Sequence, residues 1–329
     1  MNRKKFLSEF EKRLKESLQR KNSRLFSRAL HQSGKYTTLG AGAKRFRPEL
    51  VYAFGTAVGA AGEDLVKMAV TAELVHTASL LHDDVIDNGT HRRGKPCVHV
   101  VKSNTTAVLC GDLLYSRALV ELGGFRREVM TAAIQTVTDM TIASSLEYES
   151  RGNAKLDRKS WENIAIGKTG RLFGWCGMAA ALEQGNPAAA RDFARCGEQL
   201  GMAFQLADDI LDFYSASTGK KTFADLVNRN PNYVLCVSAR LDRKLHREIT
   251  GMWNGDESAP ELVRELGEKI RDSGCINRAM SAFQNYLEHC LVIVEKYDLG
   301  QIRGHLRRWT EKLYRVIQPA ATQEIGNKT

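Results

Sequence analysis

Two short segments of this sequence carry the same carboxylate pattern, Asp-Asp-x-x-Asp. The six aspartates are Asp83, Asp84 and Asp87 in the first segment and Asp208, Asp209 and Asp212 in the second. On a helix, residues three and four apart share a face, so each triad projects three like charges from one side. These charges repel one another among apolar neighbours, and a cation must compensate them. Carboxylates combined with phosphate oxygens and water suit Mg²⁺, so the triads indicate a magnesium site.

The opposing interpretation is that each triad is only a solvated acidic helix face. One triad alone is more often a solvated face than a metal site, but two copies embedded in apolar residues favour the metal site. An EF-hand is excluded, because its spacing and its required glycine are missing. The neighbours His82 and Asp83 could indicate a His-Asp metal phosphohydrolase, an alternative that leaves the second triad unexplained.

Basic residues accompany the triads. A diphosphate held by magnesium needs Arg and Lys to neutralise its remaining charge. The candidate sets are Lys44 with Arg47, Arg92 with Arg93, Lys168 with Thr169, and Lys220 with Lys221. Each set alone is ordinary surface, and its place beside the triads favours phosphate binding. The Gly-Lys-Thr run before Gly170 lacks the upstream glycine of a P-loop, so a nucleotide-binding loop is rejected.

The elements that position these residues are predicted to be helices. The chain has six prolines, with none between Pro96 and Pro187, and proline breaks helix interiors. Apolar residues there recur at helical spacing, whereas alternating strand patterns are scarce. The sequence predicts an all-α fold, with an apolar N-terminal helix stripe formed by Phe6, Phe10, Leu14 and Leu18. Further helices are expected over residues 65–86, 105–122, 127–150, 160–183, 188–214, 232–249, 261–272, 276–296 and 303–317.

No internal repeat or low-complexity linker divides the chain. The sequence therefore predicts one domain over residues 1–319, a bundle of about ten or more helices, and a polar, disordered tail over residues 320–329.

Composition narrows the functional classes. Of the 329 residues, 43% are hydrophobic, which is enough for a large core, and the net charge is +10. The basic residues form no stripe with interleaved aromatics, so nucleic acid is not an expected partner. No apolar stretch is long enough for a signal peptide or a transmembrane segment, which predicts a cytoplasmic protein. Seven cysteines without a Cys-x-x-Cys pair argue against a zinc site.

A series of motifs occurs in order along the chain. They are the run Lys44 to Pro48, the run Glu73 to Asp87 followed by Arg92 to Pro96, Gly111 to Ala118, Lys168 with Thr169, and Gly201 to Asp212. In type and order they resemble the trans-isoprenyl diphosphate synthase, or polyprenyl synthetase, family. The Gly-Asp-x-x-Tyr-x-Arg-Ala run resembles long-chain bacterial members such as octaprenyl diphosphate synthases. The resemblance implies the class I isoprenoid synthase fold, with helices around a central cavity, and a homodimer.

The resemblance also implies a reaction and a role for each residue. The enzyme would condense isopentenyl diphosphate with an allylic diphosphate, head to tail, by ionisation, condensation and elimination. The six aspartates would ligate three Mg²⁺ ions. Isopentenyl diphosphate would be bound by Lys44, Arg47, His76 and Arg93, and the allylic diphosphate by Arg92, Lys168 and Lys220. The catalytic residues would be Lys168, Thr169, Gln205 and Lys220, with Thr169 and Gln205 stabilising the allylic cation.

From the sequence alone, His76 would more often be a core histidine, and the resemblance favours substrate binding. Chain length should depend on the residues before the first triad. Ala78 and Ser79 lie about one helical turn before Asp83 and are small. Short-chain members of the family often carry an aromatic residue where Ala78 stands. Its absence predicts a long-chain product of more than fifteen carbons, with Tyr115 as a candidate floor of the pocket.

Two segments depart from the family pattern. Residues 228–232 stand where the family usually shows Gly-Lys-x-Thr, whose lysine touches diphosphate, and Arg229 or Lys221 could substitute for it. Residues 145–147 replace the usual Gly-Glu. Two alternatives remain: a class I terpene cyclase, which the second Asp-Asp-x-x-Asp disfavours, and a non-catalytic subunit of a prenyltransferase, which two whole triads disfavour.

Overall fold

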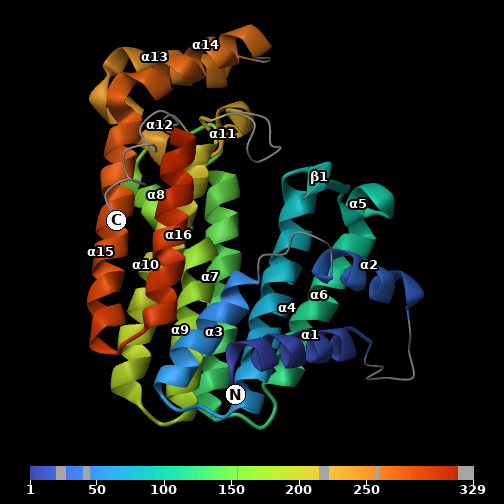
Figure 1. Ribbon diagram of the computed structural model, residues 1–329. Coiled ribbons are helices and arrows are strands. Elements are labelled where there is room, and N and C mark those ends of the chain that lie inside the picture. Colours follow the sequence, from blue (N-terminus) through green and yellow to red (C-terminus); the bar gives the residue numbers. More distant parts are fainter. Residues whose placement is uncertain are drawn as a thin grey trace. The chain divides into compact units, whose positions relative to one another are not determined.

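The computed structural model describes residues 1–19, 27–39, 45–92, 94–153, 155–214, 222–255 and 259–317. This part of the chain is almost entirely helical (Figure 1). Its only strands are the short antiparallel pair β1 (His91–Arg92) and β2 (Lys95–Pro96). The all-α fold predicted from the sequence is confirmed. The tail predicted over residues 320–329 lies outside the described residues.

The chain divides into two compact units. The first comprises Met1–Val137 and Leu172–Gly197, and the second comprises Thr138–Arg171 and Glu198–Thr329. The single domain expected over residues 1–319 stays a prediction.

The first unit is built from helices of the N-terminal part of the chain. They are α1 (Arg3–Gln19), α2 (Arg28–Thr38), α3 (Phe46–Ala57), α4 (Gly62–Ile86), α5 (Val98–Val101) and α6 (Asn104–Glu121). The first unit also takes the beginning of α7 (Arg127–Glu149), nearly all of α9 (Arg171–Glu183) and the beginning of α10 (Pro187–Leu211).

Helix α4 lies at the core of the first unit. Side chains on several of its faces are buried, among them Met68, Val70 and Leu74, and a helix that is apolar all round belongs in an interior. Helix α6 runs antiparallel beside it (Figure 1). The Thr71 hydroxyl reaches the carbonyl oxygen of Ala118 at 3.4 Å near one end of the pair. This packing fixes the helix whose last turn carries the first triad.

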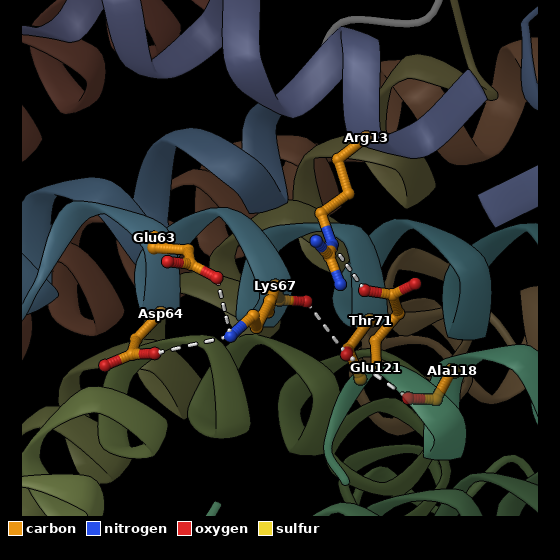
Figure 2. Close-up of polar contacts among 7 residues, drawn as sticks. All are labelled: Arg13, Glu63, Asp64, Lys67, Thr71, Ala118 and Glu121. Carbon is orange, nitrogen blue, oxygen red and sulfur yellow. Dashed lines mark hydrogen bonds and ion pairs between the residues drawn. The ribbon is translucent and has the colours of Figure 1, made fainter. Parts of the chain in front are cut away.

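Polar contacts fasten the N-terminal half of α4, as Figure 2 shows. Lys67 Nζ lies 2.9 Å from a carboxylate oxygen of Glu63, and the Thr71 hydroxyl donates to the Lys67 carbonyl oxygen at 3.0 Å. Arg13 of α1 donates from Nε to the buried carboxylate of Glu121 on α6 at 2.7 Å. The first two contacts lie within α4, three or more turns before the triad, and the Arg13–Glu121 pair joins α1 to α6, the helix that packs against α4.

The N-terminal apolar stripe packs inward as predicted. Phe6, Phe10, Leu14 and Leu18 are all fully buried in α1. The Phe6 ring lies 4.8 Å from the ring of Tyr52 on α3, which joins the two helices.

The second unit contains the remaining elements and the later parts of α7 and α10. They are α8 (Arg158–Ala165), the π-helical turn η1 (Ile166–Gly170), α11 (Ala224–Asn228), α12 (Tyr233–Leu241), α13 (Arg243–Asn254), α14 (Pro260–Ile270), the kinked segment η2 (Arg271–Cys275), in which Gly274 is non-helical with φ +84°, α15 (Ile276–Lys296) and α16 (Gly300–Ile317). Its core is rich in buried aromatic side chains, including Trp161, Phe213, Tyr233 and Trp253.

Two predicted helices are interrupted in the structure. The helix expected over residues 232–249 is two helices, α12 and α13, because Asp242 is extended with φ −134°. The Asp242 carboxylate accepts hydrogen bonds from the N–H groups of Lys244 and Leu245, so it caps a new helix. The helix expected over residues 160–183 contains the π-turn η1 between α8 and α9. In the described ranges, no helix is long and apolar enough to cross a membrane.

Candidate active site

The first triad occupies the last turn of α4, and burial separates its members. Asp84 is buried, with 4% of its surface exposed, whereas Asp83 is half-buried and Asp87 is exposed at the C-cap. The N–H of Asp87 donates to the carbonyl oxygen of Asp83 at 2.8 Å, so helical geometry continues to the end of the motif. Asp83 and Asp87, four residues apart, therefore share one face.

The middle aspartate of this triad is paired with Arg92. Both Nε and Nη2 of Arg92 lie 2.7 Å from Asp84 Oδ1. Arg92 belongs to β1, in the hairpin that follows α4, and Gly94 makes the turn with φ +74°. A buried carboxylate needs such a partner. The proposed grip of Arg92 on the allylic diphosphate stays a prediction, and Arg93 lies outside the described residues.

An aromatic pair stands beside the first triad. The ring of His82 lies 5.7 Å from the ring of Tyr115 on α6, and His82 Nε2 lies 3.5 Å from a carboxylate oxygen of Asp112. Burial, followed by the charges of Asp83 and Asp112, raises the pKa of the Tyr115 hydroxyl. Gly111 makes the approach possible, since a Cβ there would lie 2.2 Å from His82 Nε2. Tyr115 thus lies beside the motif, and its role as pocket floor stays a prediction.

Two of the residues predicted to set chain length, Ala78 and Ser79, lie on α4 about one turn before the triad. Ala78 is fully buried, and Ser79 is half-buried. The Ser79 hydroxyl donates to the carbonyl oxygen of His76 at 2.9 Å, so its polar group is satisfied within its own helix. Both positions therefore present little polarity to their surroundings, which is compatible with an apolar chain.

Two of the four residues predicted to bind isopentenyl diphosphate are described. Arg47 lies in the first turn of α3, and its guanidinium carbon sits 4.9 Å from the centre of the Phe173 ring. His76 is half-buried on α4. Lys44 lies outside the described residues, as Arg93 does.

Arg45 is a residue of this region that the sequence argument missed. It adopts a left-handed conformation with φ +50° just before α3, and it forms ion pairs with Glu11 at 2.8 Å and with Glu73. Burial lowers its pKa, but Glu73 and Glu11 outweigh burial and raise it overall. The signal in the sequence was Glu73 itself, because an acid within the apolar run of α4 needs a cation. Arg45 thereby ties α1 and α3 to α4.

The second triad ends α10, and its middle member is again the buried one. Asp209 has 2% of its surface exposed, whereas Asp208 is exposed. Asp209 Oδ2 accepts from Trp161 Nε1 at 2.7 Å and from the Tyr233 N–H at 2.8 Å. Burial and then the charge of Asp225 raise its pKa, while these hydrogen bonds oppose the rise.

Asp212 caps the next helix. Its Oδ1 accepts from the N–H of Ala224 at 2.9 Å, and its Oδ2 accepts from the N–H of Asp225 at 3.1 Å. Asp212 is half-buried. Each carboxylate oxygen accepts one backbone bond and has further lone pairs, so the cap does not exhaust its capacity as a ligand.

The structure places Thr169 beside Gln205, and their catalytic role stays a prediction. The Thr169 hydroxyl donates to Gln205 Oε1 at 3.1 Å, and Gln205 Nε2 donates to Asp209 Oδ1 at 3.0 Å. Thr169 and Lys168 lie in the π-turn η1, a feature frequent at functional sites. Lys168 forms an ion pair with Glu147, a residue of the segment that departs from the family pattern. Lys220 lies outside the described residues.

Arg229, a possible substitute for the missing lysine, is engaged elsewhere. Its Nη2 donates to the carbonyl oxygen of Gly255 at 2.7 Å, and its own carbonyl accepts from the N–H of Gly152 at 2.8 Å. It holds a left-handed conformation with φ +57°. These contacts make Arg229 a link between a loop and the end of α13. Lys221, the other possible substitute, lies outside the described residues.

The donor set fits a hard divalent cation. Within the ranges given above, no three His, Cys, Asp or Glu side chains converge closely enough to form a complete protein-built metal site. Mg²⁺ does not need one, because it usually takes one or two carboxylates and completes its shell with phosphate oxygens and water. Asp83 with Asp87 on α4, and Asp208 with Asp212 on α10, supply such carboxylates. The ligand roles of all six aspartates stay predictions.

Comparisons with known proteins agree with these features. A model of the family described as "Polyprenyl synthetase" matches residues 27–270. The octaprenyl diphosphate synthase of Haemophilus influenzae is 30% identical over 273 residues, covering 80% of this chain and 82% of its own. The geranylgeranyl diphosphate synthase of Mycobacterium tuberculosis is 34% identical over 247 residues, covering 70% of this chain and 71% of its own.

A solved structure shows the same fold. The decaprenyl diphosphate synthase from Rhodobacter capsulatus superposes with a TM-score of 0.84 at 24% identity, covering 95% of this chain and 96% of that one. At this level of identity the likeness concerns the fold, which is that of the isoprenoid synthases.

Proposed function

This chain belongs to the polyprenyl synthetase family, and we propose that it makes a long-chain polyprenyl diphosphate of more than fifteen carbons. Membership makes the chain a trans-prenyltransferase that acts on isoprenyl diphosphates. The similar proteins named above make both long and shorter products, so family membership leaves the length open. The absence of an aromatic residue at Ala78 supports the long-chain proposal.

The observation that supports prenyl transfer by this chain is that both triads are whole and that the middle aspartate of each is held by hydrogen bonds. Asp84 is held by Arg92, and Asp209 by Trp161 and the Tyr233 N–H. A non-catalytic subunit would have no need to keep two buried carboxylates in fixed positions. A terpene cyclase would have no need of the second Asp-Asp-x-x-Asp.

Asp83, Asp87, Asp208 and Asp212 are the proposed magnesium ligands. When bound, Mg²⁺ supplies positive charge to the leaving diphosphate. The contribution of the protein is to present these carboxylates at the ends of α4 and α10. Arg92 and the Trp161–Tyr233 pair act through the middle aspartates, which they hold in place.

Thr169 and Gln205 are proposed to stabilise the allylic cation. When the carbon–oxygen bond of the allylic diphosphate breaks, positive charge spreads over the allylic carbons, and oxygen dipoles aimed at them lower the barrier. The hydrogen bond between Thr169 and Gln205 fixes both oxygens in advance. The double bond of isopentenyl diphosphate then attacks the cation, and a proton passes from the new chain to the released diphosphate. Apolar helix walls around the reacting carbons would exclude water that would trap the cation.

We also propose that the protein is a homodimer in the cytoplasm. Helix α6 carries exposed apolar side chains at helical spacing, namely Val108, Leu109, Leu119 and Val120. Such a stripe on a soluble helix is typical of a surface covered by another subunit.

The reaction is tested with labelled isopentenyl diphosphate, Mg²⁺ and an allylic primer. We expect label in prenyl chains longer than the primer, and mass spectrometry of the product should show more than fifteen carbons. A cyclised hydrocarbon formed from the primer alone would favour the terpene cyclase. Absence of turnover would favour the non-catalytic subunit.

A further inference from the structure

Asn232 lies at the centre of a buried polar network in the second unit. Its side chain is fully buried, and its amide nitrogen donates both protons: to the main-chain oxygen of Asp209 at 3.2 Å and to Asp225 Oδ2 at 2.9 Å. Its amide oxygen accepts from the N–H of Val234 at 2.8 Å and caps α12. One amide therefore joins the end of α10, helix α11 and the start of α12.

The network reaches two members of the second triad. The residue after Asn232, Tyr233, donates its N–H to the carboxylate of Asp209 at 2.8 Å. Asp225, held by Asn232, donates its own N–H to the carboxylate of Asp212 at 3.1 Å. Displacement of Asn232 would loosen one support of Asp209 and one of Asp212 together.

We propose that Asn232 is a positioning residue of the second triad: its amide sets the carboxylates of Asp209 and Asp212, and with them the affinity for the metal–diphosphate unit. The inference rests on the proposed function, in which Asp212 is a magnesium ligand. Asn232 lies outside both triads. It acts through Tyr233, whose N–H contacts Asp209, and through Asp225, whose N–H contacts Asp212. Loss of such an outer support typically weakens metal binding about 10–100-fold.

The decisive variant is Asn232→Thr. Threonine also caps helices, so the start of α12 keeps its acceptor, whereas its single O–H can replace at most one of the two donated hydrogen bonds. Asn232→Asp is the second variant: it keeps the shape and the cap but turns an acceptor charge towards Asp225. The control is Asp242→Ala, which removes the carboxylate that caps α13 with a 2.6 Å bond to the Lys244 N–H, away from the triad.

Binding of Mg²⁺ with inorganic diphosphate is measured by titration calorimetry for the wild type and the three variants. Hydrogen exchange of the Tyr233 amide serves as a readout that does not depend on activity. We expect Asn232→Thr to weaken binding about tenfold or more, and Asn232→Asp to weaken it further, with faster exchange at Tyr233 in both. Steady-state rates should show a raised KM for the allylic diphosphate and a KM for isopentenyl diphosphate within about twofold of wild type.

Asp242→Ala should leave binding and Tyr233 exchange unchanged and should accelerate exchange only at the start of α13. Wild-type-like binding by a folded Asn232→Thr protein would overturn the inference and leave the proposed function standing. Equal losses in Asn232→Thr and Asp242→Ala would also overturn it, since both would then reflect general loosening. If the wild-type protein does not bind Mg²⁺ with inorganic diphosphate, the proposed function is contradicted, and the inference is contradicted with it.

Discussion

The middle aspartate of each triad differs from its neighbours in what it contacts. Asp84 and Asp209 are the buried members, and each meets charged or dipolar donors: Arg92 in one case, Trp161 and a backbone N–H in the other. A carboxylate without such donors is costly to bury. The outer aspartates are more exposed, so the repeated pattern divides one buried position from two more exposed positions, which are the proposed ligand positions.

The substitution Trp161→Phe tests whether Trp161 anchors the buried carboxylate of Asp209. Loss of the indole N–H leaves a buried carboxylate oxygen short of a donor, which we expect to cost about 1–3 kcal/mol of unfolding free energy. The matched control is Trp253→Phe, which removes a 3.0 Å bond from the indole to the Leu226 carbonyl oxygen. Urea unfolding should show losses in both variants, but only Trp161→Phe should raise the Mg²⁺ concentration needed for half-maximal rate. An equal magnesium dependence in both would contradict the anchoring role.

Ala78→Phe tests the product-length proposal. Ala78 is fully buried one turn before Asp83, so a phenyl ring there should obstruct the growing chain and shorten the product. Mass spectrometry of the products measures the change, and a thermal melt confirms that the variant folds. Unchanged chain length in a folded, active variant would show that Ala78 does not line the chain's path.

The aspartate spacing was readable from the sequence, but the partners of the aspartates were not. Three- and four-residue steps on a helix place carboxylates on one face whatever lies opposite. Arg92 could be guessed because it follows Asp84 by eight residues in a hairpin. Trp161 is 48 residues from Asp209, and only the packing of α8 against α10 brings them together. Burial of one aspartate per triad was therefore beyond the sequence argument.

Among the elements, the π-turn η1 depends on a close approach between helices. A Cβ on Gly201 of α10 would lie 2.6 Å from the Cα of Gly170 and 3.1 Å from the carbonyl oxygen of Thr169. Only glycine lets α10 come this near the turn that carries Lys168 and Thr169. The position of Thr169, in the proposed cation-stabilising pair with Gln205, thus depends on position 201 having no side chain.

Gly201→Ala should accordingly destabilise the protein by about 1–3 kcal/mol through overpacking, and should lower the rate by displacing Thr169. Gly251→Ala is the control, because Gly251 is an exposed helical position with nothing within 4 Å of its would-be Cβ. That change should stabilise α13 by about 0.5–1 kcal/mol. Unfolding curves for the two variants should move in opposite directions; movement in the same direction would refute the close-packing argument.

Helix positions were largely predictable, since scarce prolines and apolar periodicity are local properties. The interruptions were not: Asp242 breaks one expected helix because its side chain caps the N–H groups of Lys244 and Leu245. The π-turn likewise contains no proline, and its two glycines, Gly167 and Gly170, do not by themselves predict a π-turn. Both depend on which of two competing hydrogen-bond patterns the tertiary structure favours.

For the whole molecule, the exposed apolar stripe of α6 is the feature that calls for an explanation. Leu119→Glu should shift the protein from dimer to monomer in light scattering, because a charge would be buried at the proposed subunit contact. Val292→Glu, on α15 and 67% exposed, is the control and should leave the mass unchanged. A monomeric wild type would rule out the proposed dimer.

The most direct test of the ligand assignment is a crystal structure with Mn²⁺ in place of Mg²⁺ and a non-hydrolysable allylic diphosphate. Anomalous scattering locates the metal without reference to the protein. We expect metal ions about 2.0–2.2 Å from oxygens of Asp83, Asp87, Asp208 and Asp212, each also bound to diphosphate oxygens. Metal ions found away from both triads, or diphosphate bound with no metal at either, would contradict it.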